Sequence, residues 1–235
     1  MKVRLIDCVG YIVPSALGYI EEDKPRMVKT PWYDHEIPFN MAAEIGTEKV
    51  ITEHSTIGLV VTTDGSITEI PRDEYEEAEE RVVNELKEIN KPFVMLLNSL
   101  SPDSPETKNL SEALTDKYSV PVIPVNCLEL TENEITEILR SVLYRFPVSE
   151  ICVQLPSWVM TLEREHWLRS SLCNSVKESS EVVNCVSDIG SLLIGIEANE
   201  YINSATINSI DLGKGTAKIS TALSSELFYK IIEEQ

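Results

Sequence analysis

Apolar and polar residues alternate in blocks along the first part of the chain, in a pattern that predicts strands separated by helices. Continuous apolar runs rich in β-branched residues predict buried strands at residues 56–63, 92–99 and 120–127. Amphipathic stretches between and after them predict helices at residues 74–90, 104–118 and 131–146. Strands that alternate with helices favour right-handed crossovers and a parallel sheet. The sequence therefore predicts an α/β fold up to about residue 147.

The predicted helices have recognisable starts and faces. Ser104 and Pro105 suit the N-cap and first position of a helix, and Thr131 with Glu134 has the spacing of a capping box. For the helix at 74–90, we expect the core-facing side to consist of Ala78, Val82, Leu86 and Ile89. The prolines in the third apolar run place that strand near an edge of the sheet.

The pattern changes after Pro147. A strand is predicted at 150–155, followed by one long helix from about Ser157 that carries Trp158, Leu162, Leu168, Leu172 and Val176. Alternating runs at 205–212 and 215–222 flank Gly213 and Lys214 and predict a β-hairpin, and a last helix is predicted at 224–234. We infer two domains, an α/β domain at 1–147 and a smaller α+β domain at 148–235.

Composition and charge narrow the classes of function. The chain has 235 residues, of which 43% are hydrophobic, so it can form an ordinary core. Its 39 acidic residues exceed its 20 basic ones, and the resulting charge of −19 argues against nucleic acid as a partner. No apolar run approaches the roughly 20 residues that span a bilayer, and the start lacks a signal peptide. The five cysteines lie at least twelve residues apart, which is typical of reduced thiols in a cytosolic protein.

The first candidate site is an Asp-x-x-Gly pattern at Asp7 and Gly10, directly after a predicted strand at residues 3–6. An aspartate at the carboxyl end of a parallel strand can hold Mg²⁺ through water, and a glycine three residues later lets its N–H approach a γ-phosphate. Asp and Gly are also common where a strand ends in a turn, so the pattern alone is not specific.

Three further strand ends carry polar residues in the order that a nucleotide-binding sheet requires. Thr63 and Asp64 end the run at 56–63, Asn98 and Ser99 end the second run, and Asn126 and Cys127 end the third. In GTPases the second position reads Asn-Lys-x-Asp, and its carboxylate binds guanine. Here Ser99 and Ser101 replace the lysine and the aspartate. From that stretch alone, an asparagine that caps a strand end explains the pattern equally well, but the consecutive order favours a nucleotide site.

Two other site types are excluded by spacing. The stretch Gly213-Lys214-Gly215-Thr216 resembles a phosphate-binding loop, but Gly-x₄-Gly-Lys-Ser/Thr would need glycine at position 208 and Ser or Thr at 215. His35, His54 and His166 lie too far apart to indicate a metal site.

Residues 3–67, 75–98 and 146–169 carry a more specific pattern, in which the long loop from Tyr11 to Ala43 contains Pro25-Arg26-Met27 and Thr30-Pro31-Trp32-Tyr33. These stretches closely resemble the stage IV sporulation protein A family, ATPases descended from translation-factor-type GTPases. The resemblance implies a P-loop NTPase sheet followed by a middle domain, with ATP and Mg²⁺ as cofactors. It assigns Asp7 to the Mg²⁺ side and Gly10 to the γ-phosphate, and it assigns Asn98, Ser99, Asn126 and Cys127 to base-side loops.

The resemblance also implies a biological role. In the family, ATP hydrolysis drives self-assembly into filaments that coat the outer surface of the forespore from the mother-cell cytoplasm, as the base layer of the spore coat. The implied partners are further copies of the same protein, the peptide stage V sporulation protein M and the coat protein stage VI sporulation protein D. Contacts to the last two are expected mainly through a C-terminal region that these 235 residues do not contain.

Family members carry a Gly-x₄-Gly-Lys-Ser/Thr loop that is absent from these 235 residues, so we expect a fragment with an incomplete P-loop NTPase sheet. Residues 3–6 would then pair directly with residues 56–62 or be loosely held, ATP binding would be weak and hydrolysis absent. A non-catalytic scaffold module that self-associates through its middle domain is the main alternative. A phosphate-receiving response-regulator domain is disfavoured, because Asp64 is the only further acidic residue in a suitable place.

Overall fold

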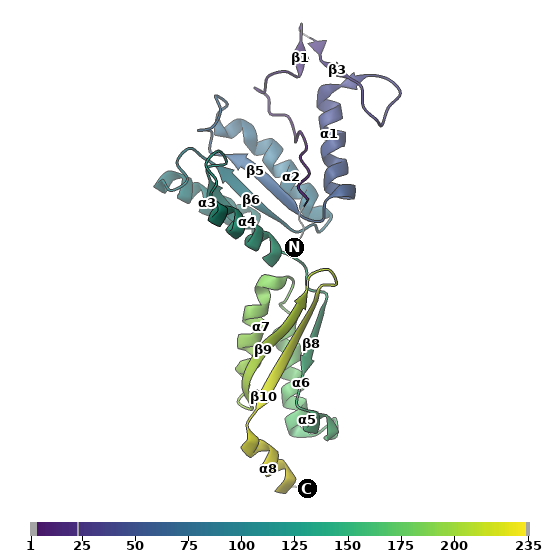
Figure 1. Ribbon diagram of the computed structural model, residues 1–235, viewed down its shortest axis with the longest axis vertical. Helices are drawn as coiled ribbons and strands as arrows, with labels where there is room; N and C mark the ends of the chain where they lie inside the picture. The colour runs from purple at the N-terminus through teal and green to yellow at the C-terminus, as the bar shows by residue number, and fades with distance from the viewer. Residues whose placement is uncertain (1–3, 23, 234–235) are drawn as a thin grey trace. The chain divides into compact units, whose positions relative to one another are not determined.

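The computed structural model describes residues 4–22 and 24–233 and contains two compact units, residues 1–142 and 143–235 (Figure 1). The first unit is built on a three-stranded parallel sheet of β5 (Gly58–Thr63), β6 (Phe93–Asn98) and β7 (Val122–Val125), in the order β5-β6-β7. Five consecutive residues of β6, from Phe93 to Leu97, are buried. The predicted parallel sheet is therefore confirmed, and β7 lies at its edge as the prolines indicated.

Three helices follow the strands of this sheet. They are α2 (Glu76–Glu88), preceded by a 3-10 turn (Arg72–Tyr75), α3 (Pro105–Tyr118) and α4 (Glu132–Tyr144). Residues of α2 and α3 form one core cluster with β6, and α4 contributes Ile138 to a second one. Both predicted helix starts are confirmed: Ser104 Oγ accepts from the N–H of Thr107 at 3.2 Å, and Thr131 and Glu134 bond reciprocally at 2.8 and 3.3 Å.

The strand β5 differs from its prediction as a strand covered on both faces. Leu59 is 43% exposed and Val61 is 56% exposed, on the face opposite Val60 and the α2–α3 cluster. The physical reason is that the cluster on this face joins Ile138 of α4 to Leu96 of β6 and Val125 of β7 and includes no residue of β5, so Leu59 and Val61 lie outside its cover.

The predicted strand at residues 3–6 is wrong for its described part. Residues 4–10 have no regular secondary structure, Leu5 is exposed, and Val3 lies outside the described residues. An extended segment needs a neighbouring strand to satisfy its backbone groups, and none pairs with Arg4–Ile6 in the described part of the chain.

In place of the long loop, the structure has two short ladders, β1 (Ile20–Glu21) with β2 (Lys24–Pro25) and β3 (Met27–Val28) with β4 (Ile37–Pro38). They lead into α1 (Phe39–Lys49) and a π-helical turn (Val50–His54).

The second unit has a mixed sheet. Its strands are β8 (Glu150–Gln154), β9 (Ile202–Asp211) and β10 (Thr216–Leu223), ordered β8-β10-β9, with β8 parallel and β9 antiparallel to β10. Its helices are α5 (Ser157–Thr161), α6 (Trp167–Ser180), α7 (Ile189–Glu197) and α8 (Ser225–Glu233), with a 3-10 turn (Val186–Asp188) before α7. All four helices and all three strands contribute to one apolar core.

For this unit, the predicted long helix is wrong and the predicted hairpin is confirmed. The single long helix is wrong, because residues 162–166 separate α5 from α6, and α7 was not predicted. The hairpin is confirmed, since β9 and β10 pair across the turn that contains Gly215. Gly215 has φ +64°, and a Cβ there would lie 2.8 Å from Ser149 Oγ and 3.0 Å from the carbonyl oxygen of Pro147. This turn therefore requires glycine, and it does not open a helix as a phosphate-binding loop does.

Candidate functional site

The carboxyl ends of the three parallel strands bring six predicted site residues to one edge of the first unit. Thr63 lies beside Asn98 in the ladder, and Asn98 lies beside Val125. Asp64 and Ser99 follow directly, and Asn126 and Cys127 follow Val125. Carboxyl ends of parallel strands are where α/β sheets bind ligands. The structure thus places the four predicted base-side residues along this edge, together with Thr63 and Asp64, which were predicted to border the nucleotide.

Asp64 is held by hydroxyl and amide donors. Its Oδ1 accepts from the N–H of Ser66 at 2.9 Å and from the Ser66 hydroxyl at 2.6 Å, and its Oδ2 accepts from the Thr107 hydroxyl at 3.2 Å. Burial opposes ionisation of this carboxyl, but hydrogen bonds from Ser66, Ser99 and Thr107 outweigh it and lower the pKa of Asp64. The edge therefore carries an ionised carboxylate in a fixed orientation.

Ser99 stands where GTPases have lysine, and its side chain is fully buried. Its hydroxyl lies 3.3 Å from the Thr107 hydroxyl and accepts from the N–H of Ser101 at 3.0 Å. Ser101, which stands where GTPases have the guanine-binding aspartate, is therefore held by a hydroxyl-based turn. At these two positions, serines joined by a hydrogen bond replace the lysine and the aspartate of a guanine site.

The loop after β7 is anchored to the end of β6. The Asn98 side-chain oxygen accepts from the backbone N–H of Cys127 at 3.0 Å. Asn126 is bonded within its own loop, since its Oδ1 accepts from the N–H of Leu128 at 3.1 Å. Burial raises the pKa of the Cys127 thiol, which argues against its use as a nucleophile. These contacts give Asn98 and Cys127 a role in shaping the edge.

The donors and acceptors at this edge suit a neutral aromatic base better than a phosphate. Among the six residues along this edge, Asp64 is the only charged one, and its charge is negative. An anionic phosphate would be repelled here, whereas the amino group of a base could donate to an oxygen of the Asp64 carboxylate. Phosphate contacts must therefore come from another part of a nucleotide site.

The two predicted phosphate-side residues, Asp7 and Gly10, make no hydrogen bond to the residues of this edge within the described chain. Asp7 is exposed, and the N–H of Gly10 donates to Thr47 Oγ1 of α1 at 3.1 Å. Gly10 has φ +78°, a conformation that favours glycine. In the described residues no hydrogen bond joins Asp7 or Gly10 to the six residues along this edge. The structure thus brings the candidate base-side residues together but, within its described ranges, shows no polar contact between them and the two candidate phosphate-side residues.

A magnesium ion would find little protein ligation in the described part of the chain. No group of three or more His, Cys, Asp or Glu side chains suited to a metal occurs there. Nucleotide-bound Mg²⁺ commonly takes one or two carboxylates, waters and phosphate oxygens as ligands. The exposed Asp7 carboxylate fits that limited role, in which the nucleotide itself supplies most of the ligands.

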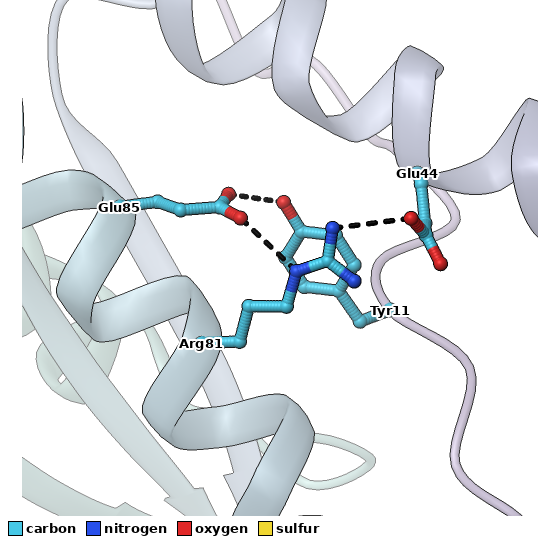
Figure 2. Close-up of polar contacts among 4 residues, drawn as sticks. All are labelled: Tyr11, Glu44, Arg81 and Glu85. Atoms are coloured by element: carbon cyan, nitrogen blue, oxygen red, sulfur yellow. Dashed lines mark hydrogen bonds and ion pairs between the residues drawn. The ribbon is translucent and has the colours of Figure 1, made fainter.

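Sequence reasoning missed several residues that shape both sides. Ser66 and Thr107 orient Asp64, and their signal was available in the Asp-Gly-Ser turn and in the capped start of α3. On the other side, Tyr11 contacts Arg81 and Glu85 of α2, as Figure 2 shows. No local signal identifies that contact, because Tyr11 and Glu85 lie 74 positions apart.

Comparisons with known proteins agree with the arrangement of the chain. Residues 1–147 match the family model described as stage IV sporulation protein A, ATPase domain, and residues 148–235 match the middle domain of the same protein. No solved structure matches the chain at a significant level. Within the described ranges, no helix has the length and apolar character needed to cross a membrane.

Curated relatives are similar over the entire chain. Stage IV sporulation protein A of Bacillus anthracis and that of Bacillus subtilis (strain 168) are each 48% identical over 234 residues, and that of Clostridioides difficile (strain 630) is 47% identical over 235. In each case the match covers 100% of this chain and 48% of the relative, so the chain spans about half the length of the curated relatives it matches. The chain belongs to the stage IV sporulation protein A family.

Proposed function

We propose that this chain contains the base-binding part of an ATP site with a P-loop NTPase sheet, in a protein of the spore coat base layer. ATP binding and hydrolysis by the whole protein would drive self-assembly into filaments on the outer forespore surface, on the mother-cell side, as coat and cortex formation require. The family match supports the ATPase class. Hydrolysis by these 235 residues alone is not expected, because they contain no Gly-x₄-Gly-Lys-Ser/Thr loop.

The observation that carries the choice of ATP is the loop after β6. A guanine site needs a carboxylate at the position of Ser101 and uses a lysine at that of Ser99, whereas here both are serines joined by a hydrogen bond of 3.0 Å. Loss of a buried hydrogen-bonding partner discriminates strongly against the base that needs it. This edge therefore lacks the side chains that would select guanine over adenine.

A binding experiment tests this proposal. Mg-ATP and Mg-GTP are titrated into the purified chain by calorimetry, and release of phosphate is followed in parallel. We expect weak binding of ATP, GTP binding no tighter than ATP binding, and no turnover. A clear preference for GTP would contradict the choice of base. Turnover comparable with that of a full-length relative would contradict the proposed incompleteness of the site.

The partners proposed for the whole protein are further copies of itself, stage V sporulation protein M at the forespore membrane surface, and stage VI sporulation protein D. These proposals rest on the family resemblance. The last two contacts are proposed to lie mainly outside these 235 residues. A pull-down with each purified partner, using this chain and a full-length relative side by side, tests that assignment. Equal capture by both would contradict it.

A non-catalytic scaffold role in the same layer is the second candidate, and the sheet of the second unit favours it. The outer strand β9 carries no charged residue from Ile202 to Ile210, in a chain of which 25% is charged. Uncharged outer strands are suited to pairing with another chain. Part of this edge is already covered, because Ala205 donates its N–H to Glu197 at 2.7 Å. Incorporation into filaments of a full-length relative without nucleotide would favour the scaffold role, and a strict need for ATP would oppose it.

A further inference from the structure

The segment from Gly10 to Ser15 is attached to two different helical regions of the first unit. Gly10 donates its N–H to Thr47 Oγ1 on α1 at 3.1 Å. The N–H and hydroxyl of Ser15 donate to Glu74, in the turn before α2, at 2.8 and 2.7 Å. Figure 1 shows the chain passing between α1 and α2 here, in keeping with these contacts. The segment is therefore held at both ends.

Between those ends, Tyr11 is bound by two residues of α2. Its hydroxyl donates to Glu85 Oε2, and its ring lies 4.1 Å from the Arg81 guanidinium carbon (Figure 2). A guanidinium over an aromatic face is attracted by the ring quadrupole. Tyr11 is thus bound at its ring and at its hydroxyl, directly after the glycine whose amide is the candidate phosphate contact.

Arg81 connects three parts of the chain through one planar group. Its Nε donates to Glu85 Oε1 at 3.1 Å, its Nη2 donates to Glu44 Oε2 on α1 at 3.1 Å, and its face covers the Tyr11 ring. Arginine makes such divided contacts through its rigid fork, whereas lysine offers a single point charge. Exposed ion pairs are individually weak, so the shared geometry matters more than either pair alone.

Burial raises the pKa of Tyr11, and its hydrogen bond to Glu85 raises it further. The Tyr11 hydroxyl therefore stays protonated at neutral pH and donates its hydrogen bond to Glu85. Glu44 and Glu85 together carry more negative charge than Arg81 carries positive, so the cluster does not act as a free cation toward phosphate.

We propose that Arg81 is a positioning residue for the candidate phosphate-side segment, acting through Tyr11 to fix the backbone on which the Gly10 amide is displayed. The inference rests on the proposed ATP site in one respect, that Gly10, as the family resemblance implies, contacts the terminal phosphate of the nucleotide. In the present structure that amide is bonded to Thr47, so a phosphate oxygen would have to replace the Thr47 hydroxyl as its acceptor. With Tyr11 held by Arg81, the change is confined to the peptide at Gly10, which glycine at φ +78° can rotate.

Hydrogen exchange of peptides spanning residues 7–16 tests the attachment without any nucleotide. Arg81→Met removes both ion pairs and the cation over the ring, and we expect exchange there to become roughly tenfold faster. Arg81→Lys should restore protection only in part. Arg140→Met is the matched control, since Arg140 forms an exposed ion pair with Glu137 on α4 at 3.0 Å. Exchange at 7–16 that is unchanged in Arg81→Met, or equally fast in the control, would overturn the proposal.

Tyr11→Phe guards against a folding defect, because it keeps the ion pairs of Arg81 and removes only the hydroxyl bond to Glu85. We expect faster exchange at residues 7–16 with far-ultraviolet circular dichroism unchanged. If exchange at 7–16 stays at the wild-type rate in this variant, the bond through Tyr11 does not position the segment and the proposal is overturned.

A nucleotide measurement separates positioning from simple packing. If Gly10 faces a terminal phosphate, Arg81→Met should weaken Mg-ATP severalfold more than Mg-ADP, while Arg140→Met should weaken neither. Equal weakening of both nucleotides would overturn the positioning role. If neither the wild type nor any variant binds either nucleotide, the proposed function fails. The exchange experiment then still decides whether Arg81 holds the segment.

Discussion

The backbone N–H of Cys127 donates to the side-chain oxygen of Asn98 at 3.0 Å, so the loop after β7 is fixed to the end of β6. Asn98→Ala removes the acceptor and leaves that N–H unpaired. We expect a loss of about 1–2 kcal/mol in the free energy of unfolding of the first unit, measured by urea denaturation. Asn98→Asp, which keeps an acceptor, should lose less. An equal loss in both variants would show that the hydrogen bond is not the cause.

Asp64 gives a pH-dependent prediction. Its pKa is lowered in the folded chain, so its ionised form stabilises the fold above the unfolded pKa of about 4. That contribution is lost as the pH falls through the lower folded pKa. We expect Asp64→Asn to reduce the free energy of unfolding at pH 7 by up to about 1 kcal/mol, because the half-exposed carboxylate is screened by solvent. The difference from wild type should shrink as the pH falls below the unfolded pKa and disappear once Asp64 is protonated in the folded chain as well.

The control for that titration is Asp103→Asn, because the Asp103 side chain is 96% exposed and its ion pair with Lys108 is a surface contact. This variant should track the wild type across the pH range. A difference between Asp64→Asn and wild type that is constant from pH 7 to pH 2.5 would refute the linkage to ionisation.

A charged residue on the buried face of α2 makes the stability of the first unit depend on one arginine. Glu79 Oε1 accepts from Arg72 and from the Tyr118 hydroxyl, both at 2.8 Å, and the Glu79 side chain is only 2% exposed. Burial, followed by the bond to Glu79, raises the pKa of Tyr118 to about 12. Arg72→Met would leave a buried carboxylate without its cation, and we expect a loss of about 3–5 kcal/mol in urea unfolding.

Replacing both charged partners tests that explanation. The double variant Arg72→Met with Glu79→Leu removes the uncompensated charge, so it should recover most of the stability lost in Arg72→Met. Tyr118→Phe should cost about 1–3 kcal/mol. A double variant as unstable as the single one would mean that packing, and not the buried charge, accounts for the loss.

The turn before β10 distinguishes two neighbouring glycines. Gly215→Ala places a side chain at φ +64° and within 3.0 Å of the Pro147 carbonyl oxygen, so we expect a loss of about 1–3 kcal/mol in the unfolding of the second unit. Gly213→Ala meets only Asp211 Oδ1 at 3.4 Å and should change stability by less than about 0.5 kcal/mol. Thermal denaturation of the two variants compares them directly, and equal effects would refute the steric argument.

The parallel sheet could be predicted because its strands are continuous apolar runs, and this pattern does not depend on which side chains pack against them. The core face of α2 was predicted less well. Ile89 is exposed, and Glu79 and Val83 are buried in its place along with Leu86. A charged residue in the core is invisible to a hydrophobic pattern, since its burial depends on Arg72 and Tyr118 from other parts of the chain.

Two other errors have local causes. The helix predicted from Ser157 is interrupted because Leu162 is extended and His166 caps α6, its Nδ1 accepting from the N–H of Leu168 at 3.2 Å. Histidine is not among the residues that usually predict a cap. At the candidate site, the base-side edge followed from strand order, but the attachment of Tyr11 to α2 depends on contacts distant in sequence, which no local pattern encodes.

The outer strand β5 has a consequence for the behaviour of the purified chain in solution. Its free edge presents backbone groups that no strand of the described residues pairs with, together with the exposed side chains of Leu59 and Val61, and it contains no charged residue. Copies of the chain repel one another through a net charge of −19, which opposes pairing at this edge. Because salt shortens that repulsion to a few ångströms at about 1 M, the chain should stay dispersed in dilute buffer and associate as ionic strength rises.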